Sequence, residues 1–271
     1  MSELVLLQSQ MKLLALILAY LISHTIQKPD KLRDFTWFKS WAKWFEKSSG
    51  IKSPELNVIL TVAIPVTLIY FILSLLLGSV LGVLLVSVLI LFYVIGPHSL
   101  KEDAESGEIH KRLGLRKNTK VSTLIKTMTE VSMHRWFGVF FWYVVLGVAG
   151  ALIYRLSERL DFYTENDNEL KSTTTRLMKV LNFPAAWMMV ISLAIASDFE
   201  RIFKKCKPYM SFENIKSMDD SFLYEATDFA VEICEIEPDE QKNVELVTLS
   251  VLKRMLVVWL VVVSIQVILA I

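Results

Sequence analysis

The strongest constraint on this chain is a stretch from residue 56 to residue 100 that contains no Asp, Glu, Lys or Arg. Within it, the residues from Val58 to Ile95 are almost all apolar. A membrane-spanning helix needs roughly 20 apolar residues, so this stretch is long enough for two such helices. The sequence therefore predicts a hairpin with spans of about 57–77 and 79–95, joined by a tight turn at Gly78 and Ser79.

Four more apolar segments extend this pattern to an all-α, polytopic helical membrane protein that forms a single domain over residues 1–271. Two of them are long and clean enough to span, and two are less clear because one contains Lys12 and the other is short and holds Pro184. The one with Lys12 either spans or inserts only in part, and the one with Pro184 spans, re-enters or packs as a buried helix. The clear segments are 136–154 and 255–271, and the doubtful ones are 4–26 and 181–196.

Polar residues separate the apolar segments and predict the orientation of the chain. Lysines and arginines are frequent on both sides of the hairpin, so the positive-inside rule places both sides in the cytoplasm and the hairpin tip outside. Residues 98–135 and 198–250 are expected to be helical cytoplasmic segments. Residues 28–52 mix lysines with tryptophans, which is typical of a helix at the lipid interface or of aromatic packing on another segment.

Composition and motifs exclude several classes of function. A net charge of +1 argues against a nucleic-acid partner. The two cysteines, Cys206 and Cys234, have no metal-ligand spacing, and no phosphate-binding or dinucleotide-binding loop is present, so neither a metal nor a cofactor is expected. The expected partners are the lipid bilayer and a protein or small anionic ligand on the cytoplasmic side.

Polar residues at the two ends of the 136–154 segment are the candidate ligand-binding residues. Glu130 and His134 are four residues apart and share one helix face, with Arg135 next to them. Arg155 and Asp161 follow the segment. Together they could bind an anionic ligand, or they could be charges that collect at a membrane interface. A ligand site requires the two ends to meet, which a straight span forbids and a bent helix permits.

Residues 134–156 (HRWFGVFFWYVVLGVAGALIYRL) carry a resemblance to a known family. The Phe-Trp pair, the Gly-x-x-Gly-Ala step and the Tyr-Arg ending resemble the AmpE family of bacterial inner-membrane proteins, which is linked to the regulation of beta-lactamase induction. The segment from Lys179 to Pro184 and the valine-rich last span are also similar. This resemblance implies a multi-pass protein of the bacterial inner membrane with a regulatory, non-enzymatic role.

The AmpE family is in turn similar to the CobD/CbiB synthases, which join aminopropanol to a corrinoid carboxyl group. Three motifs of those synthases are altered here. Their Ala-Glu-Asn step is Thr129-Glu130-Val131, their Asn-Thr-Leu-Asp-Ser is residues 158–162 with only Leu160 and Asp161 kept, and their Pro-x-Arg is Pro184-Ala185-Ala186. Losing these polar groups removes most of the expected transition-state stabilisation. The alternative function is a divergent CobD-like ligase for a phosphate- or carboxylate-bearing substrate.

Overall fold

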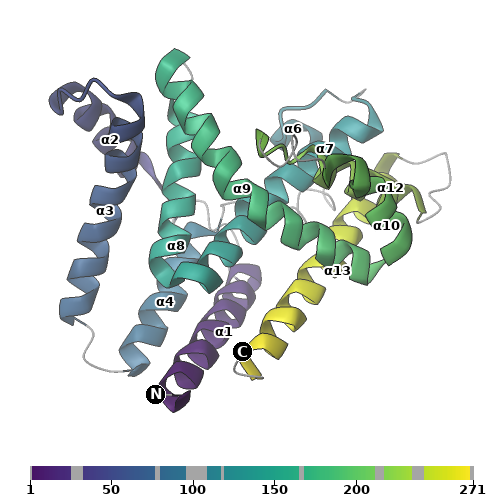
Figure 1. Ribbon diagram of the computed structural model, residues 1–271, viewed down its shortest axis with the longest axis horizontal. Helices are drawn as coiled ribbons and strands as arrows, with labels where there is room; N and C mark the ends of the chain where they lie inside the picture. The colour runs from purple at the N-terminus through teal and green to yellow at the C-terminus, as the bar shows by residue number, and fades with distance from the viewer. Residues whose placement is uncertain are drawn as a thin grey trace. The chain divides into compact units, whose positions relative to one another are not determined.

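The computed structural model describes residues 2–25, 33–76, 80–95, 109–116, 119–164, 168–210, 217–233 and 241–268. Every regular element in these ranges is a helix, which confirms the predicted all-α fold (Figure 1). Four helical stretches are long and apolar enough to cross a membrane, and the chain is therefore a multi-pass membrane protein. These stretches are Pro54–Ser74, Val121–Tyr163, Glu169–Ala196 and Val244–Ile265.

The helices form two compact units, each described by itself. Unit 1 consists of Met1–Pro97, Gly138–Leu181 and Ala270–Ile271, and unit 2 of His98–Phe137 and Asn182–Leu269. Unit 1 holds α1 (Ser2–Thr25), α2 (Thr36–Ser48), α3 (Pro54–Leu76), α4 (Val80–Val94), α8 (Gly138–Tyr163) and the first half of α9 (Asn168–Ala196). Unit 2 holds the rest of α9, α6 (Ile109–Arg112), α7 (Val121–Ser132), the π-helix η2 (Met133–Phe137), α10 (Phe199–Cys206), η3 (Lys207–Met210), α12 (Ser221–Ile233) and α13 (Gln241–Ile268).

The charge-free stretch forms α3 and α4, and the predicted turn at 78–79 lies outside the described residues. α3 begins at Pro54, where the backbone N–H of Leu56 donates to Ser53 Oγ at 3.3 Å, as expected for a serine cap followed by proline. α3 remains helical through Pro65. α1 runs beside α4 and buries Ala15, Leu16 and Ala19 (Figure 1).

α8 is not a straight helix, because Gly147 has φ 68° and ψ −152°. Only glycine adopts this conformation readily. A Cβ on Gly138 would lie 2.1 Å from Tyr154 Cζ, although sixteen helical residues would separate the two by about 24 Å in a straight helix. A Cβ on Gly150 would likewise lie 2.1 Å from the carbonyl oxygen of Trp142. The chain therefore folds back at Gly147, and its two arms pack against each other.

This fold-back changes the interpretation of the expected 136–154 span. Within α8, the arms before and after Gly147 are about 13 Å and about 24 Å long, and a bilayer core is about 30 Å thick. The parts of 136–154 on either side of Gly147 are therefore each too short to cross that thickness, although the longer helical stretch Val121–Tyr163 has the length and composition of a span. The physical reason is local: the backbone at one glycine turns the chain, while apolarity and length are the same for a straight and a folded-back segment.

The two doubtful apolar segments and the last span are parts of longer helices. The apolar residues 181–196 form the second half of α9, which starts at Asn168 and contains Pro184. The predicted span 255–271 forms much of α13, which starts at Gln241 inside the expected segment 198–250. The first segment, 4–26, coincides closely with α1.

α2 is an amphipathic helix that packs on α3 and α8. Its inner face buries Phe38 and Phe45, and the indole N–H of Trp41 donates to the carbonyl oxygen of Thr61 at 3.0 Å. Trp37 and Trp44 remain 42% and 58% exposed. α2 thus combines the two features expected from residues 28–52, aromatic packing on one face and exposed tryptophans and lysines on the other.

In unit 2, α12 packs against α7, α10 and α13. Its buried face includes Phe222, Leu223 and Ala226, and Phe222 stacks on Trp187 of α9 with 4.5 Å between ring centroids. Tyr224 and Phe229 of the same helix are half-buried, and the ammonium groups of Lys126 and Lys205 lie over their rings.

Candidate functional site

A cavity of about 240 Å³ lies in unit 1 where α2 and α3 meet the end of α8 and the start of α9. Its polar lining comes from Lys39, Lys43, Glu46, Asn57, Thr61, Tyr163 and Thr164. We call it the Lys39 cavity. Asn57 and Thr61 are buried, and Thr61 Oγ1 donates to the backbone carbonyl oxygen of Asn57 at 2.7 Å and lies 3.2 Å from Asn57 Oδ1. These contacts hold the two polar side chains on the wall formed by α3.

Lys39 and Lys43 give the Lys39 cavity its positive character. They are four residues apart on α2, so they share one helix face, and both are exposed. The Lys39 ammonium lies over the ring of Tyr163, 5.4 Å from its centroid. Glu46 lines the same cavity, but no described acidic side chain forms an ion pair with either lysine. This lining favours a ligand with a carboxylate or phosphate group.

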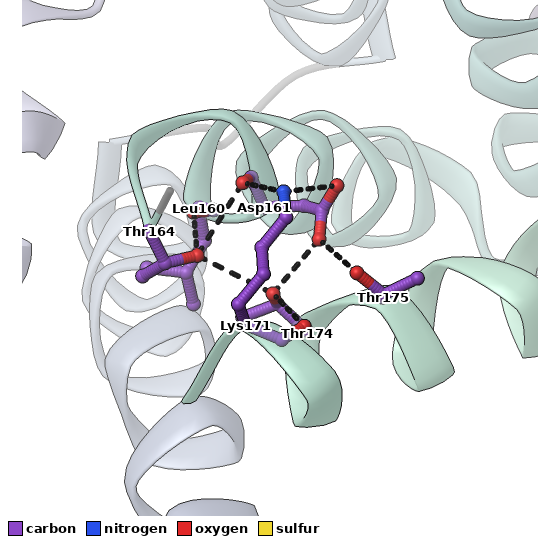
Figure 2. A network of polar contacts seen from close by, with 6 residues as sticks. All are labelled: Leu160, Asp161, Thr164, Lys171, Thr174 and Thr175. Carbon is purple, nitrogen blue, oxygen red and sulfur yellow. Dashed lines mark hydrogen bonds and ion pairs between the residues drawn. The ribbon is translucent and has the colours of Figure 1, made fainter. Parts of the chain in front are cut away.

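Asp161 follows Leu160, which lines the Lys39 cavity, and takes part in a network of polar contacts between α8 and α9 (Figure 2). Its Oδ1 accepts hydrogen bonds from Thr174 Oγ1 at 2.8 Å and Thr175 Oγ1 at 3.0 Å. Its Oδ2 lies 3.1 Å from the ammonium nitrogen of Lys171. The carboxylate is thus bound by three side chains from one face of α9.

The Asp161 network positions the cavity wall. Thr164, which lines the cavity, donates to the carbonyl oxygen of Leu160 at 2.8 Å and lies 3.3 Å from the Thr174 hydroxyl. Asp161 therefore holds the end of α8 on α9 and keeps Leu160, Tyr163 and Thr164 in place. Since its oxygens already have three partners, this arrangement suits a positioning residue better than a group that contacts a ligand.

Arg155 is fully enclosed in unit 1, with 1% of its surface exposed. Its Nε donates to the carbonyl oxygen of Val94, the last residue of α4, and its Nη1 lies 3.1 Å from Glu158 Oε2. Arg159 Nε lies 3.4 Å from the same Glu158 oxygen, and its guanidinium lies over Phe35. Arg155 therefore caps the end of α4 and joins it to α8.

The other predicted residues belong to unit 2. Glu130 is exposed in the last turn of α7, while His134 and Arg135 are half-buried in the π-helix that follows. The charges of Glu130 and His134 act on Asp220, just before α12. Burial raises the pKa of the Asp220 carboxyl, the nearby carboxylates of Asp219 and Glu130 raise it further, and His134 lowers it. This is a second polar cluster, built of α7, η2 and the start of α12.

Two further groups in unit 2 were not expected to interact. His110 Nδ1 lies 3.0 Å from Glu245 Oε1, and both side chains are largely buried. His110 Nε2 is enclosed and has no hydrogen-bond partner among the described residues. Burial also raises the pKa of the Cys206 thiol to about 11, which leaves it protonated and a poor nucleophile at neutral pH. Cys234 lies outside the described residues.

The structure thus divides the five predicted residues between the two units. Arg155 and Asp161 lie in unit 1, and Glu130, His134 and Arg135 in unit 2. The sequence did not identify Lys39 and Lys43 as site residues, nor the partners of Asp161. A signal was present for the latter in the hydroxyl-rich run Ser172–Thr175 that follows Lys171. Among the described residues, no three His, Cys, Asp or Glu side chains are grouped to hold a metal ion.

Comparison with known proteins gives one informative similarity. The chain is 29% identical over 193 residues to the "Probable cobalamin biosynthesis protein CobD" of Methanothermobacter thermautotrophicus. The match covers 63% of this chain and 64% of that protein, so the chain matches slightly less than two thirds of the relative's length. No protein-family model matches the chain. No solved structure matches it. The predicted similarity to CobD is confirmed, and the AmpE assignment receives no support from these comparisons.

Proposed function

We propose that this chain is a CobD-like membrane ligase that binds a phosphate- or carboxylate-bearing substrate in the Lys39 cavity. The observation that carries the proposal is the pair of exposed lysines on a preformed polar cavity in a chain similar to a cobalamin biosynthesis protein. Lys39 and Lys43 would bind the anionic group of the substrate. Tyr163 and Thr164 would orient it, and Asp161 would hold the wall that carries them.

The position of the Lys39 cavity fits a substrate that approaches from water. Asn57 lies near the start of α3, beside the exposed lysines of α2. By the positive-inside rule this end of α3 faces the cytoplasm, so we infer that the substrate comes from there and that the membrane is the cytoplasmic one. A reporter fused near Gly78 should then report outside, while fusions near Gly107 and Asp219 report the cytoplasm. A fusion near Gly107 that reports outside would reverse this orientation.

The ligase proposal is tested by restoring corrinoid synthesis in a strain that lacks its CobD enzyme. The wild-type chain should restore synthesis, and a variant with both Lys39→Met and Lys43→Met should lose at least about tenfold of the rate. Lys47→Met is the matched control, because Lys47 is an exposed lysine of the same helix outside the cavity lining. A wild-type chain that is present in the membrane at normal levels but restores no synthesis would refute the proposal.

A second candidate function is the regulatory, AmpE-like role. One observation favours it: the arginine of the synthase Pro-x-Arg motif corresponds to Ala186, which is fully buried in α9. An arginine side chain has no room there without repacking. If this role holds, deleting the gene should change beta-lactamase induction while corrinoid synthesis stays normal. The two measurements made on one deletion strain separate the candidates.

A further inference from the structure

Lys12 is the charged residue of the apolar part of α1. It lies within the apolar helical stretch Gln10–Ser23, and its side chain is half-buried. Among the described side chains, none forms an ion pair or hydrogen bond with it. A charged side chain inside a membrane layer is costly, so such residues usually face a cavity or a partner.

Lys12 faces a cavity of about 240 Å³ that is also lined by the break in α8. The lining includes Gly147, together with the hydroxyl-bearing residues Tyr70, Ser87 and Tyr143. We call it the Lys12 cavity. A Cβ on Gly147 would lie 3.9 Å from Lys12 Cε, so the lysine side chain passes close to the point where the backbone turns. Broken helices at membrane depth are tolerated where they line a cavity, because the freed backbone groups need polar partners.

An apolar cavity of about 320 Å³ adjoins the Lys12 cavity between α3, α4 and α8. The two share Tyr70, Ser87 and two valines, and the second continues along Leu73, Ser74 and Val86. The Ser74 hydroxyl donates to the carbonyl oxygen of Phe71 at 2.7 Å within its own helix. The combined space has a positive charge and hydroxyls at one end and hydrocarbon side chains at the other. This is the complement of a molecule with an anionic head and a hydrocarbon tail.

We propose that the Lys12 cavity binds an anionic amphiphile, with its phosphate or carboxylate head at Lys12 and its tail along Leu73 and Val86. The site is separate from the Lys39 cavity, since the two share no lining residue. Val58 and Tyr70 of α3, which line one cavity each, are about 18 Å apart along the helix. Binding here can therefore succeed or fail independently of the proposed ligase activity.

The test is a titration of the purified full-length protein in non-ionic detergent, followed by native mass spectrometry. The probes are dodecyl phosphate, dodecyltrimethylammonium and inorganic phosphate. Wild-type protein should bind dodecyl phosphate about tenfold more tightly than Lys12→Met, and Lys12→Arg should retain most of the affinity. Lys179→Met is the control, because Lys179 is an exposed lysine of unit 1 that lines neither cavity. Val86→Phe, which fills the apolar part, should weaken dodecyl phosphate binding.

Three outcomes would overturn the proposal: equal affinity in wild type and Lys12→Met, equal affinity for dodecyltrimethylammonium, or inorganic phosphate binding as tightly as dodecyl phosphate. Native mass spectra of the purified protein before any probe is added identify the source of the natural ligand. A co-purified phospholipid that Lys12→Met lacks would identify a membrane lipid. Protein that is empty on purification but binds added dodecyl phosphate would identify a free amphiphile. Both results support the site.

Discussion

The Lys39 cavity and the Lys12 cavity lie toward opposite ends of α3, and they are built in different ways. The wall of the first is held by the carboxylate of Asp161, which contacts three side chains of α9 and so fixes the end of α8. The second depends on a backbone break at Gly147 beside one lysine. A polar cavity in a membrane protein can therefore be built either from paired charges at a helix end or from a helix that is interrupted within an apolar layer. The two designs should respond to different substitutions.

The largest effect is expected from Gly150→Ala, which tests the fold-back next to the Lys12 cavity. The new methyl group would meet the carbonyl oxygen of Trp142 and Leu146 Cβ, and backbone cannot move aside easily. The variant should lose about 3 kcal/mol of free energy of unfolding, measured by unfolding in SDS. It should also lose dodecyl phosphate binding. In a straight helix the same substitution would increase the free energy of unfolding by up to about 1 kcal/mol. The sign of the measured change therefore distinguishes a folded-back α8 from a straight one.

Gly138→Ala is expected to cost somewhat less, about 2 kcal/mol, because its obstacle is a side chain, the ring of Tyr154. A double-mutant cycle with Tyr154→Leu checks the cause. Removing the ring should abolish most of the cost of the alanine, giving a coupling energy above about 1 kcal/mol. Residues 24 Å apart in a straight helix would show additive effects, and additivity here would disprove the fold-back.

These glycines show where the sequence predicts the fold well and where it does not. Ser53 and Pro54 mark the start of α3 because a cap acts within one helical turn, and the apolar composition identifies the membrane helices because it reflects their lipid surroundings. Gly147 carries no such local signal. Glycine is common in membrane helices, and only tertiary packing selects the conformation that turns the chain. Proline commonly ends or kinks a helix, but α3 continues through Pro65, so the presence of this proline does not predict a helix end.

The candidate site shows the same limit. Asp161 could be identified from its place after an apolar segment, but its partners Lys171, Thr174 and Thr175 follow a turn whose geometry sets the register between two helices. The lysines of α2 were read as charges at the lipid interface, because the sequence does not reveal that α3 and α8 enclose a cavity beside them. A sequence shows which residues are polar, but the cavities that they line are formed by tertiary packing and are not visible in it.

Thr174→Val tests the construction of the Lys39 cavity, with a smaller expected effect of about 1 kcal/mol in the free energy of unfolding. Thr174 is 1% exposed, so valine fits the site but leaves Asp161 Oδ1 with one hydrogen bond fewer. Thr173→Val is the matched control, since the Thr173 hydroxyl only donates to the carbonyl oxygen of Glu169 on the exposed side. Equal costs for the two variants would show that the Asp161 network does not stabilise the α8–α9 corner. Dodecyl phosphate binding at Lys12 should be unchanged.

The smallest effect concerns a carboxyl group that contrasts with Asp161, namely Asp220 of unit 2. Its pKa is raised mainly by burial, and the carboxylates of Asp219 and Glu130 add to this, while His134 acts in the opposite direction. A raised pKa in the folded state means that the stability due to this group is complete below the ordinary Asp pKa and is lost as pH rises through the folded value. At neutral pH the ionised Asp220 therefore destabilises unit 2.

Asp220→Asn should accordingly melt at a slightly higher temperature than wild type at pH 7.5, and the gap should shrink as the pH is lowered toward 4. Thermal melting of the purified protein across this range measures the gap, and Glu200→Gln, an exposed acid of α10, serves as the control. A gap that grows on acidification would mean that Asp220 is stabilised as a carboxylate and would contradict this prediction. A gap that shrinks would show that unit 2 tolerates the charge of Asp220 at a cost in stability, as its burial predicts.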